Sequence, residues 1–262
     1  MRLVDGSHRD VYGCVPRQDD SAACGVRAGH DRTHELFTSP RFMEFLPDLA
    51  GLSVIDLGCG EGRYTRLFAR RGAKMTGIDI SPRMIDLAQQ EEVRAPLGIR
   101  YQVDSSTELR SIANNSFDAA VSCMALMDTP DFAAVARETY RVLRPKGGFF
   151  FSVLHPCFMG RDSTWAKDAQ GTVTARLVPN YWCAERYVER WGFENAPEFS
   201  IHYFPYRLED YINGLCDAGF RIERIHEPRP SAELIEAHPE MTFLAHLRHH
   251  SAFVLFAAGR KS

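Results

Sequence analysis

The stretch VIDLGCGEGR, Val54–Arg63, decides the fold prediction. It joins a short apolar segment, 53–57, to residues 62–71, whose apolar side chains recur at helical spacing. Three glycines lie between the two segments, at Gly58, Gly60 and Gly62. A glycine-rich turn between a buried strand and a helix is typical of the first βα unit of an open α/β sheet. An acid, Asp56, stands just before the glycines, where it would repel a phosphate.

The residues that follow alternate between strand-like and helix-like segments. Strands are predicted at 74–79, 99–104, 117–126 and 148–154, and helices at 81–92 and 131–143. Ser81 as N-cap and Pro82 at the first helical position mark one helix start, and Pro145 with Gly147 closes the later helix. This alternation predicts a Rossmann-like, doubly wound α/β sheet, mostly parallel and covered by helices on both faces. Strands are also expected at 221–228 and 251–260, the final one antiparallel.

The chain divides into four predicted parts. Residues 1–50 form an N-terminal arm and a cap helix, and residues 51–154 form the ligand-binding core. Residues 155–204 are rich in aromatic side chains and are predicted to be an insertion that covers the ligand crevice as a lid. Residues 205–262 return to the core, with a helix at 208–220. The crevice itself should lie at the carboxyl ends of the strands.

Composition excludes several classes of function. A net charge of −3 over 262 residues gives no electrostatic basis for binding nucleic acid or a membrane surface. Seven cysteines at irregular spacing fit reduced thiols better than a disulfide framework, and the first residues contain no apolar run typical of a signal peptide. We therefore expect a cytoplasmic protein that acts on a small molecule.

The glycine pattern argues against a nicotinamide cofactor. A dinucleotide-binding fingerprint requires G-x-G-x-x-G, in which the third glycine lets the helix approach the strand. This chain has G-x-G-x-G, and Arg63 occupies the place of that third glycine. An NAD-dependent oxidoreductase is therefore the less favoured alternative.

Three acids end three successive predicted strands: Asp56, Asp79 and Asp104. A single aspartate at a strand end is usually a helix cap, but three around one glycine turn indicate a ligand site. Two like charges about 4 Å apart in a partly buried site repel by roughly 4 kcal/mol, so a cationic ligand is favoured. Asp79 can accept both hydroxyls of a ribose, Asp104 an adenine amino group, and Asp56 can favour a positive methionine portion. S-adenosylmethionine carries all of these groups.

The arrangement resembles the class I S-adenosylmethionine-dependent methyltransferases. The resemblance rests on VIDLGCGEG, GIDIS, VDSSTEL, FDAAVSCMALM and LRPKGGFFFSVL, and it covers about residues 52–154. It implies cofactor contacts from Gly58, Gly60, Asp79 and Asp104, and from the backbone near Ile80, Ser105 and Ser122. The resemblance also relates Tyr12 to an early tyrosine that approaches the cofactor carboxylate in such enzymes.

Two histidines are candidates for the catalytic base. His155 follows the fifth predicted strand and is expected to face the crevice, although it could instead bond a backbone carbonyl and shape the insertion. His202 lies near the end of the insertion and is the second candidate. His246, His249 and His250 have helical spacing, but no acid or cysteine completes a metal site, so a solvated helix end is expected and no metal is predicted.

The predicted reaction is methyl transfer to a small aromatic or hydrophobic metabolite, in secondary metabolism, with oxygen, nitrogen or carbon as the acceptor atom. The aromatic insertion supports this prediction, because aromatic side chains bury planar or apolar ligands. C-methylation of a prenyl or terpenoid acceptor is an alternative, and a non-catalytic ligand-binding protein on the same fold is another. A homo-oligomer, most simply a dimer, is the default expectation for the assembly.

Overall fold

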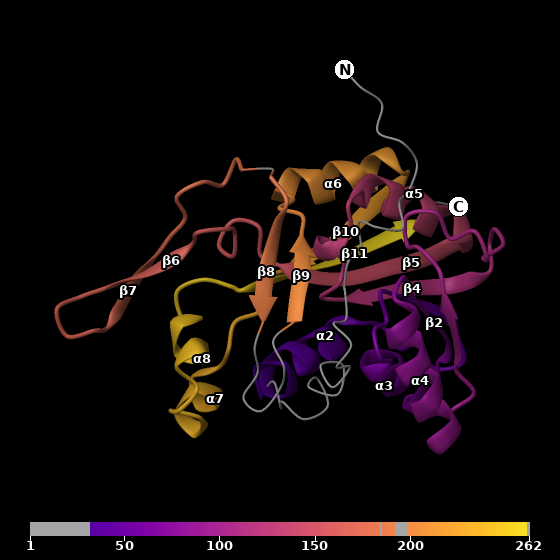
Figure 1. Ribbon diagram of the computed structural model, residues 1–262, viewed down its shortest axis with the longest axis horizontal. Coiled ribbons are helices and arrows are strands. Elements are labelled where there is room, and N and C mark those ends of the chain that lie inside the picture. The colour runs from indigo at the N-terminus through magenta and orange to yellow at the C-terminus, as the bar shows by residue number, and fades with distance from the viewer. Residues whose placement is uncertain (1–31, 184, 192–198, 261–262) are drawn as a thin grey trace.

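The computed structural model describes residues 32–183, 185–191 and 199–260. Tyr12 and most of the predicted N-terminal arm lie outside the described residues. The described chain forms one central sheet with helices on both faces and two smaller β-hairpins (Figure 1).

Seven strands form the central sheet in the order β10-β11-β5-β4-β1-β2-β3. Their bounds are β1 Ser53–Leu57, β2 Lys74–Asp79, β3 Arg100–Val103, β4 Phe117–Cys123, β5 Leu143–Leu154, β10 Phe220–His226 and β11 Phe253–Arg260. The first five strands are mutually parallel, whereas β11 pairs antiparallel with both β5 and β10. The mostly parallel sheet and its antiparallel final strand are therefore confirmed. The strand order reverses between β1 and β4, which places a ligand crevice at their carboxyl ends.

Helices cover the sheet on two faces because each central strand is apolar on both. In β1, Val54 belongs to the core beneath α2, α3 and α4, whereas its neighbour Ile55 belongs to the core beneath α5 and α6. The bounds are α2 Ser39–Phe45, α3 Arg63–Arg70, α4 Pro82–Arg94, α5 Phe132–Val142 and α6 Leu208–Asp217. A short π-helix, η2 His34–Thr38, precedes α2. Figure 1 shows the two groups of helices on opposite sides of the strands.

The predicted helix starts are confirmed at α4. Ser81 caps this helix by accepting a hydrogen bond from the backbone N–H of Met84 at 3.4 Å, and Pro82 is its first residue. The predicted end of α5 is wrong in detail. This helix ends at Val142, and Pro145 already lies in β5, whose residue Leu143 pairs with Phe117 of β4. Sheet pairing with β4 thus ends the helix before the proline.

The predicted insertion contains two antiparallel hairpins. One consists of β6 Thr164–Lys167 and β7 Val173–Leu177, and the other of β8 Tyr187–Trp191 and β9 Phe199–Tyr203. In Figure 1 the β6–β7 hairpin projects away from the sheet, whereas β8 and β9 lie across the middle of the molecule. Two short helices, α7 Ala232–Ala237 and α8 Thr242–His246, lie between β10 and β11. Among the described residues, the structure contains no helix that is long and apolar enough to cross a membrane.

Candidate functional site

A cavity of about 220 Å³ opens at the carboxyl ends of the parallel strands. It is lined by residues that follow β1, β2, β3 and β4 and by two residues of β9: Gly58, Gly60, Asp79, Ile80, Ser81, Met84, Asp104, Ser105, Ser106, Ala125, Leu126, Asp128, Thr129, Ser200 and His202. Seven of these residues are predicted from the sequence as site residues, namely Gly58, Gly60, Asp79, Ile80, Asp104, Ser105 and His202. Strand ends far apart in the chain therefore meet at one site. The predicted residues Asp56, Ser122 and His155 do not line this cavity.

The glycine turn lets the backbone itself form one wall. Gly58 has φ +72°, and a Cβ there would lie 2.6 Å from the Cβ of Ala125, so no side chain fits. Gly60 has φ +54°, and a Cβ at this position would meet no described atom within 4 Å. Gly60 lines the cavity and has no side chain, so a ligand there can approach its backbone closely.

Gly62 allows the close approach of helix and strand for which a dinucleotide-binding fingerprint uses a glycine at the next position, here Arg63. It is the N-cap of α3 with φ +85°, and a Cβ there would collide with the hydroxyl of Tyr101 on β3. The short G-x-G-x-G spacing therefore already allows close approach of helix and strand. The side chain of Arg63 is displaced outward, where it lies 3.6 Å from Glu35.

Backbone N–H groups hold the carboxylate of Asp79 in one orientation. Gly60 donates to Oδ2 and Ser81 donates to Oδ1, both at 2.9 Å. Burial raises the pKa of this carboxyl, and the two hydrogen bonds oppose that rise. Each carboxylate oxygen retains a further lone pair, so a ribose diol can donate to both oxygens.

Asp104 is likewise fixed by local donors. Its Oδ1 accepts from the backbone N–H of Ser105 at 2.8 Å. Its Oδ2 accepts from the backbone N–H of Ser111 at 3.0 Å and from the Ser111 hydroxyl. The carboxylate therefore lies at the end of β3 in a defined position, from which it can accept a further donor such as an adenine amino group.

Asp56 lies beneath the glycine turn rather than in the cavity. Its side chain is only 2% exposed and accepts a 2.6 Å hydrogen bond from the hydroxyl of Thr65 in the first turn of α3. Burial raises its pKa to about 7, the Thr65 hydrogen bond opposes the rise, and the charge of Asp79 adds to it. Ser122 is also buried and donates to the carbonyl of Leu57 at 2.7 Å. Both side chains connect elements around the turn.

His155 is not oriented as the sequence suggested. Its backbone N–H donates to the carbonyl of Ala252 at 2.8 Å, which extends the β5–β11 pairing by one residue. The imidazole is 2% exposed, bonds Glu227 with 2.5 Å between Nε2 and Oε1, and accepts from the Cys157 N–H at Nδ1. Burial lowers its pKa, while Glu227 opposes the effect. Strand pairing thus turns His155 toward the β10 side of the sheet, away from the cavity lining.

His202 does reach the cavity, together with Ser200 two residues earlier on β9. Side chains two residues apart lie on the same face of a strand, so both point from one face of the hairpin. The backbone N–H of Phe204 donates to the carbonyl of Met127 at 2.9 Å, which fastens β9 to the 3-10 helix η3, Leu126–Asp128. This contact brings the insertion to the wall formed by η3.

Sequence reasoning missed the site residues in and directly after η3, among them Asp128 and Thr129. Their only sequence signal was their position directly after β4, because residues after parallel strands border the crevice. Met84, Ser106 and Ser200 were also missed, and Ser81 was predicted only as a helix N-cap. Ser81, Met84 and Ser106 lie two to five residues beyond the acids at the ends of β2 and β3, but Ser200 belongs to a hairpin whose course the sequence did not reveal.

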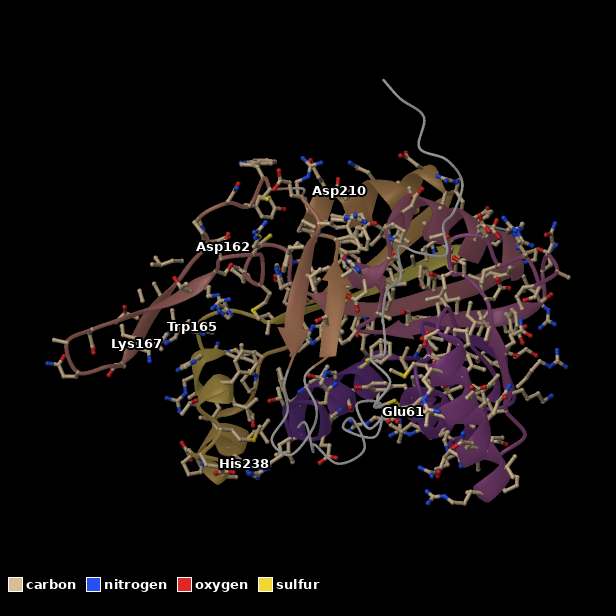
Figure 2. All side chains as sticks on the ribbon, viewed as in Figure 1. Glu61, Asp162, Trp165, Lys167, Asp210 and His238 are labelled. Atoms are coloured by element: carbon tan, nitrogen blue, oxygen red, sulfur yellow. The ribbon has the colours of Figure 1, made fainter. Side chains whose placement is uncertain are left out.

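Of the three histidines at and after the end of α8, His249 is exposed as expected, whereas His250 packs against aromatic side chains. The ring of His250 is stacked between Phe158 and Trp165, with centroid distances of 5.2 and 4.9 Å. The guanidinium of Arg176 on β7 lies 4.5 Å from the centroid of the Trp165 ring, and Figure 2 shows Trp165 on the side of β6 toward α8. Packing against Phe158 and Trp165 thus leaves His250 half-buried. Among residues 32–183, 185–191 and 199–260, the structure contains no cluster of three metal-ligating side chains.

The comparisons agree with this geometry. Residues 55–151 match a family model described as a methyltransferase domain. The ubiquinone biosynthesis O-methyltransferase of Xanthomonas oryzae pv. oryzae is 38% identical over 109 residues, covering 41% of this chain and 45% of that protein. The chain thus matches less than half the length of this curated relative. The crystal structure of an S-adenosylmethionine-dependent methyltransferase from Mesorhizobium loti is 30% identical, with TM-score 0.69, covering 84% of this chain and 96% of that one.

This chain belongs to the S-adenosylmethionine-dependent methyltransferases. Its cofactor is accordingly S-adenosylmethionine, and the site fits that molecule. The open space at Gly60 accommodates close approach of a ligand, and the fixed carboxylates of Asp79 and Asp104 are acceptors for hydroxyl and amino donors. The match to the family model ends within β5, whereas the Mesorhizobium loti structure matches 84% of the chain.

Proposed function

We propose that this protein transfers the methyl group of S-adenosylmethionine to a hydroxyl of a small aromatic metabolite. The observation that carries the proposal is the cavity itself, in which cofactor-binding strand ends face His202 of the β8–β9 hairpin. The similarity to ubiquinone biosynthesis O-methyltransferases supports oxygen as the acceptor atom. Their matches cover less than half of those proteins, so the aromatic character of the acceptor rests on the insertion of this chain.

The proposed mechanism uses residues of this chain to position two reactants and to move one proton. The sulfonium of the bound cofactor supplies an activated methyl carbon for in-line displacement. Asp79, oriented by the Gly60 N–H, would accept the ribose hydroxyls, and Asp104, oriented by the Ser105 N–H, would accept from the adenine amino group, so these two residues would hold the cofactor. An imidazole nitrogen of His202 takes the proton from the acceptor hydroxyl, because neutral imidazole is a suitable base near pH 7. The β8–β9 hairpin covers the reactants and excludes water.

Side-chain contacts fix the position of the β8–β9 hairpin, which carries His202. Tyr203, next to His202, is buried and its ring lies 5.0 Å from that of Tyr187 on β8. Tyr206, three residues further on, donates its hydroxyl to the carbonyl of Thr129 at 2.7 Å and accepts from the backbone N–H of Phe132 at 2.9 Å. These contacts fix the end of β9 on the connection between β4 and α5, so His202 has a defined place in the cavity.

A radiolabelled methyl-transfer assay tests the reaction. Purified protein is incubated with methyl-labelled S-adenosylmethionine and a panel of mono- and dihydroxylated aromatic compounds, with amines and isoprenoid alcohols for comparison, and products are identified by mass spectrometry. We expect O-methylated phenols. Transfer confined to nitrogen or carbon acceptors would contradict the proposed acceptor class.

His202→Ala should lower kcat for the best phenol by about 100-fold or more, which is the usual contribution of a general base. Affinity for S-adenosylhomocysteine should change little, because the cofactor is held by the opposite wall. Ser200→Ala is the matched control, since Ser200 lines the same cavity from the same strand and carries no base. Full activity of His202→Ala would remove the histidine from the mechanism.

The remaining predictions concern setting and assembly. A role in secondary metabolism, a cytoplasmic location and a homo-oligomeric state stay predictions from the sequence. They enter this proposal only as the setting in which a small-molecule methyltransferase of this kind would act.

A further inference from the structure

The chain leaves β4 through a residue with a left-handed backbone. Met124 directly follows the last residue of β4 and has φ +54°. This conformation is unfavourable for residues other than glycine, asparagine and aspartate. The side chain of Met124 is half-buried and packs against the core. A non-glycine residue keeps such a backbone where the surrounding structure imposes it, and residues of this kind are frequent beside functional sites.

Ser152 of β5 holds this turn from the neighbouring strand. The backbone N–H of Met124 donates to the carbonyl oxygen of Ser152 at 3.0 Å and to its hydroxyl oxygen at 3.2 Å. The same hydroxyl donates to Sγ of Cys123 at 3.4 Å, and Cys123 is the residue that pairs with Ser152 in the β4–β5 ladder. Ser152 is fully buried, which strengthens these hydrogen bonds. One serine thus joins the last residue of β4 to the first residue beyond the strand.

The turn at Met124 determines where the following residues lie. Ala125 and Leu126 come directly after it, and both line the cavity. Ala125 lies so close to the glycine turn that a Cβ added to Gly58 would be 2.6 Å from the Cβ of Ala125. An extended backbone at Met124 would continue the direction of β4, so the left-handed turn is what brings these two residues to the glycine turn.

The position of β9 depends on the same turn. The short helix η3 starts two residues after Met124, and its residue Met127 accepts a 2.9 Å hydrogen bond from the backbone N–H of Phe204. His202 lies two residues before Phe204 and lines the cavity. A change of backbone direction at Met124 would therefore move η3 and, with it, the end of β9.

We propose that Met124 and Ser152 are positioning residues for methyl transfer: the left-handed turn at Met124, held by Ser152, sets the place of η3 and of His202 relative to the glycine turn. Neither side chain lines the cavity, so both act through the backbone that leaves β4. The part that concerns His202 as the base rests on the proposed function, whereas the placement of η3 does not.

A matched pair of substitutions separates the backbone turn from side-chain packing. Leucine and isoleucine have the same atoms, but a β-branched side chain is poorly compatible with a left-handed backbone. Met124→Leu nearly conserves volume and should behave like the wild type. In Met124→Ile we expect amide hydrogen exchange in residues 125–132 and 199–206 to be at least about tenfold faster than in Met124→Leu, as measured by mass spectrometry. Exchange in β2 and β3 should be the same in both variants.

Binding and turnover provide a second measurement on the same two variants. Met124→Ile should bind S-adenosylhomocysteine within about threefold of Met124→Leu, because Asp79 and Asp104 follow other strands. Its kcat for the best phenol should be about tenfold lower or less than that, since a misplacement of about 1 Å can lower a rate by about 100-fold. A purely structural role would not separate kcat from cofactor affinity in this way.

Ser152→Ala is the milder variant, and it decides the test if Met124→Ile does not fold. It removes the hydroxyl acceptor of the Met124 N–H and keeps the carbonyl acceptor. We expect exchange in residues 125–132 and 199–206 to rise by about threefold to tenfold over the wild type, the usual effect of one lost hydrogen bond.

Three results would overturn the proposal. They are equal exchange in Met124→Ile and Met124→Leu, equal losses of kcat and of S-adenosylhomocysteine affinity in Met124→Ile, and wild-type exchange in Ser152→Ala. Failure of the proposed reaction is distinguishable from these. If exchange changes as expected but the wild-type protein methylates no phenol, the proposed chemistry is wrong and the role of Met124 and Ser152 in placing η3 stands.

Discussion

The two walls of the cavity are built in different ways. The cofactor wall comes from β1, β2 and β3 and their short connections, and its acids are held by neighbouring backbone N–H groups, such as Gly60 and Ser81 around Asp79. The other wall, which we propose binds the acceptor, combines η3 with the β8–β9 hairpin, and the two meet through Met127 and Phe204, which are 77 residues apart in the chain. Local backbone geometry fixes the first wall, and tertiary contacts fix the second. We therefore expect mutations in each wall to affect one ligand and not the other.

The largest expected effect lies on the cofactor wall. Asp79→Ala should weaken binding of S-adenosylhomocysteine by at least about 30-fold, on the order of 2 kcal/mol, because it removes a charge-assisted acceptor. Isothermal titration measures this effect. The binding of a neutral catechol should change by less than about threefold. If Asp79→Ala lost affinity for S-adenosylhomocysteine and for the catechol equally, the two walls would not act independently. Unchanged affinity for S-adenosylhomocysteine would show that Asp79 does not bind the cofactor.

An effect of similar size is expected on stability at Asp56, which lies beneath the turn. The folded-state pKa of about 7 is above the usual 3.8, so the wild-type protein holds a proton that the unfolded chain releases. Its contribution to stability is complete below pH 4 and is lost as the pH rises to 7. Asp56→Asn cannot titrate and its amide oxygen can still accept from Thr65. Relative to this variant, we expect the wild type to lose on the order of 2 kcal/mol of unfolding free energy from pH 4.5 to 7.5.

Urea unfolding of both proteins at several pH values measures that difference. Cofactor affinity is a second measurement that distinguishes a stabilising role of Asp56 from a binding role, because Asp56 lies outside the cavity lining. S-adenosylhomocysteine should bind Asp56→Asn within about threefold of the wild type. A large loss of affinity would restore the direct role that the sequence suggested for this acid, and a pH-independent stability difference would contradict its raised pKa.

The smallest effect is expected at Gly60. A Cβ in Gly60→Ala meets no described protein atom, but Gly60 lines the cavity, so we expect the added methyl group to lower affinity for S-adenosylhomocysteine about fivefold, roughly 1 kcal/mol. The positive φ adds a fold destabilisation of about 1 kcal/mol. Gly58→Ala is the contrasting variant, because its Cβ collides with Ala125 of the other wall. We expect Gly58→Ala to disturb both ligands, as judged by titration and thermal unfolding. Equal behaviour of the two variants would contradict this assignment.

Prediction succeeded where neighbours in sequence are neighbours in space. The glycine turn, the N-cap at Ser81 and the acids that end β2 and β3 all depend on a few consecutive residues, and all were found. Asp56 shows the limit of this reasoning. Its place at a strand end was correct, but whether the carboxylate faces the cavity or Thr65 depends on how α3 packs against β1. Sequence position specifies the end of a strand and does not specify the direction of its last side chains.

The histidines show the same limit at longer range. From the sequence, His155 was the first candidate for the base and His202 the second, yet the structure places His202 in the cavity and pairs His155 with Glu227, which is 72 residues further along the chain. His250 was expected in solvent and is instead stacked between aromatic side chains of the insertion. In each case the deciding partner belongs to a hairpin or strand edge whose docking no local pattern encodes.

By itself, the sequence determined the parallel sheet, the glycine turn and the acids of the cofactor wall. Helix and strand periodicity, capping and glycine geometry are short-range effects, and they act within a few residues. Only the tertiary structure decided which histidine enters the cavity, that Asp128 joins it and that Asp56 is buried. Those outcomes depend on packing between segments distant in the chain, such as the fastening of β9 to η3 by one backbone hydrogen bond.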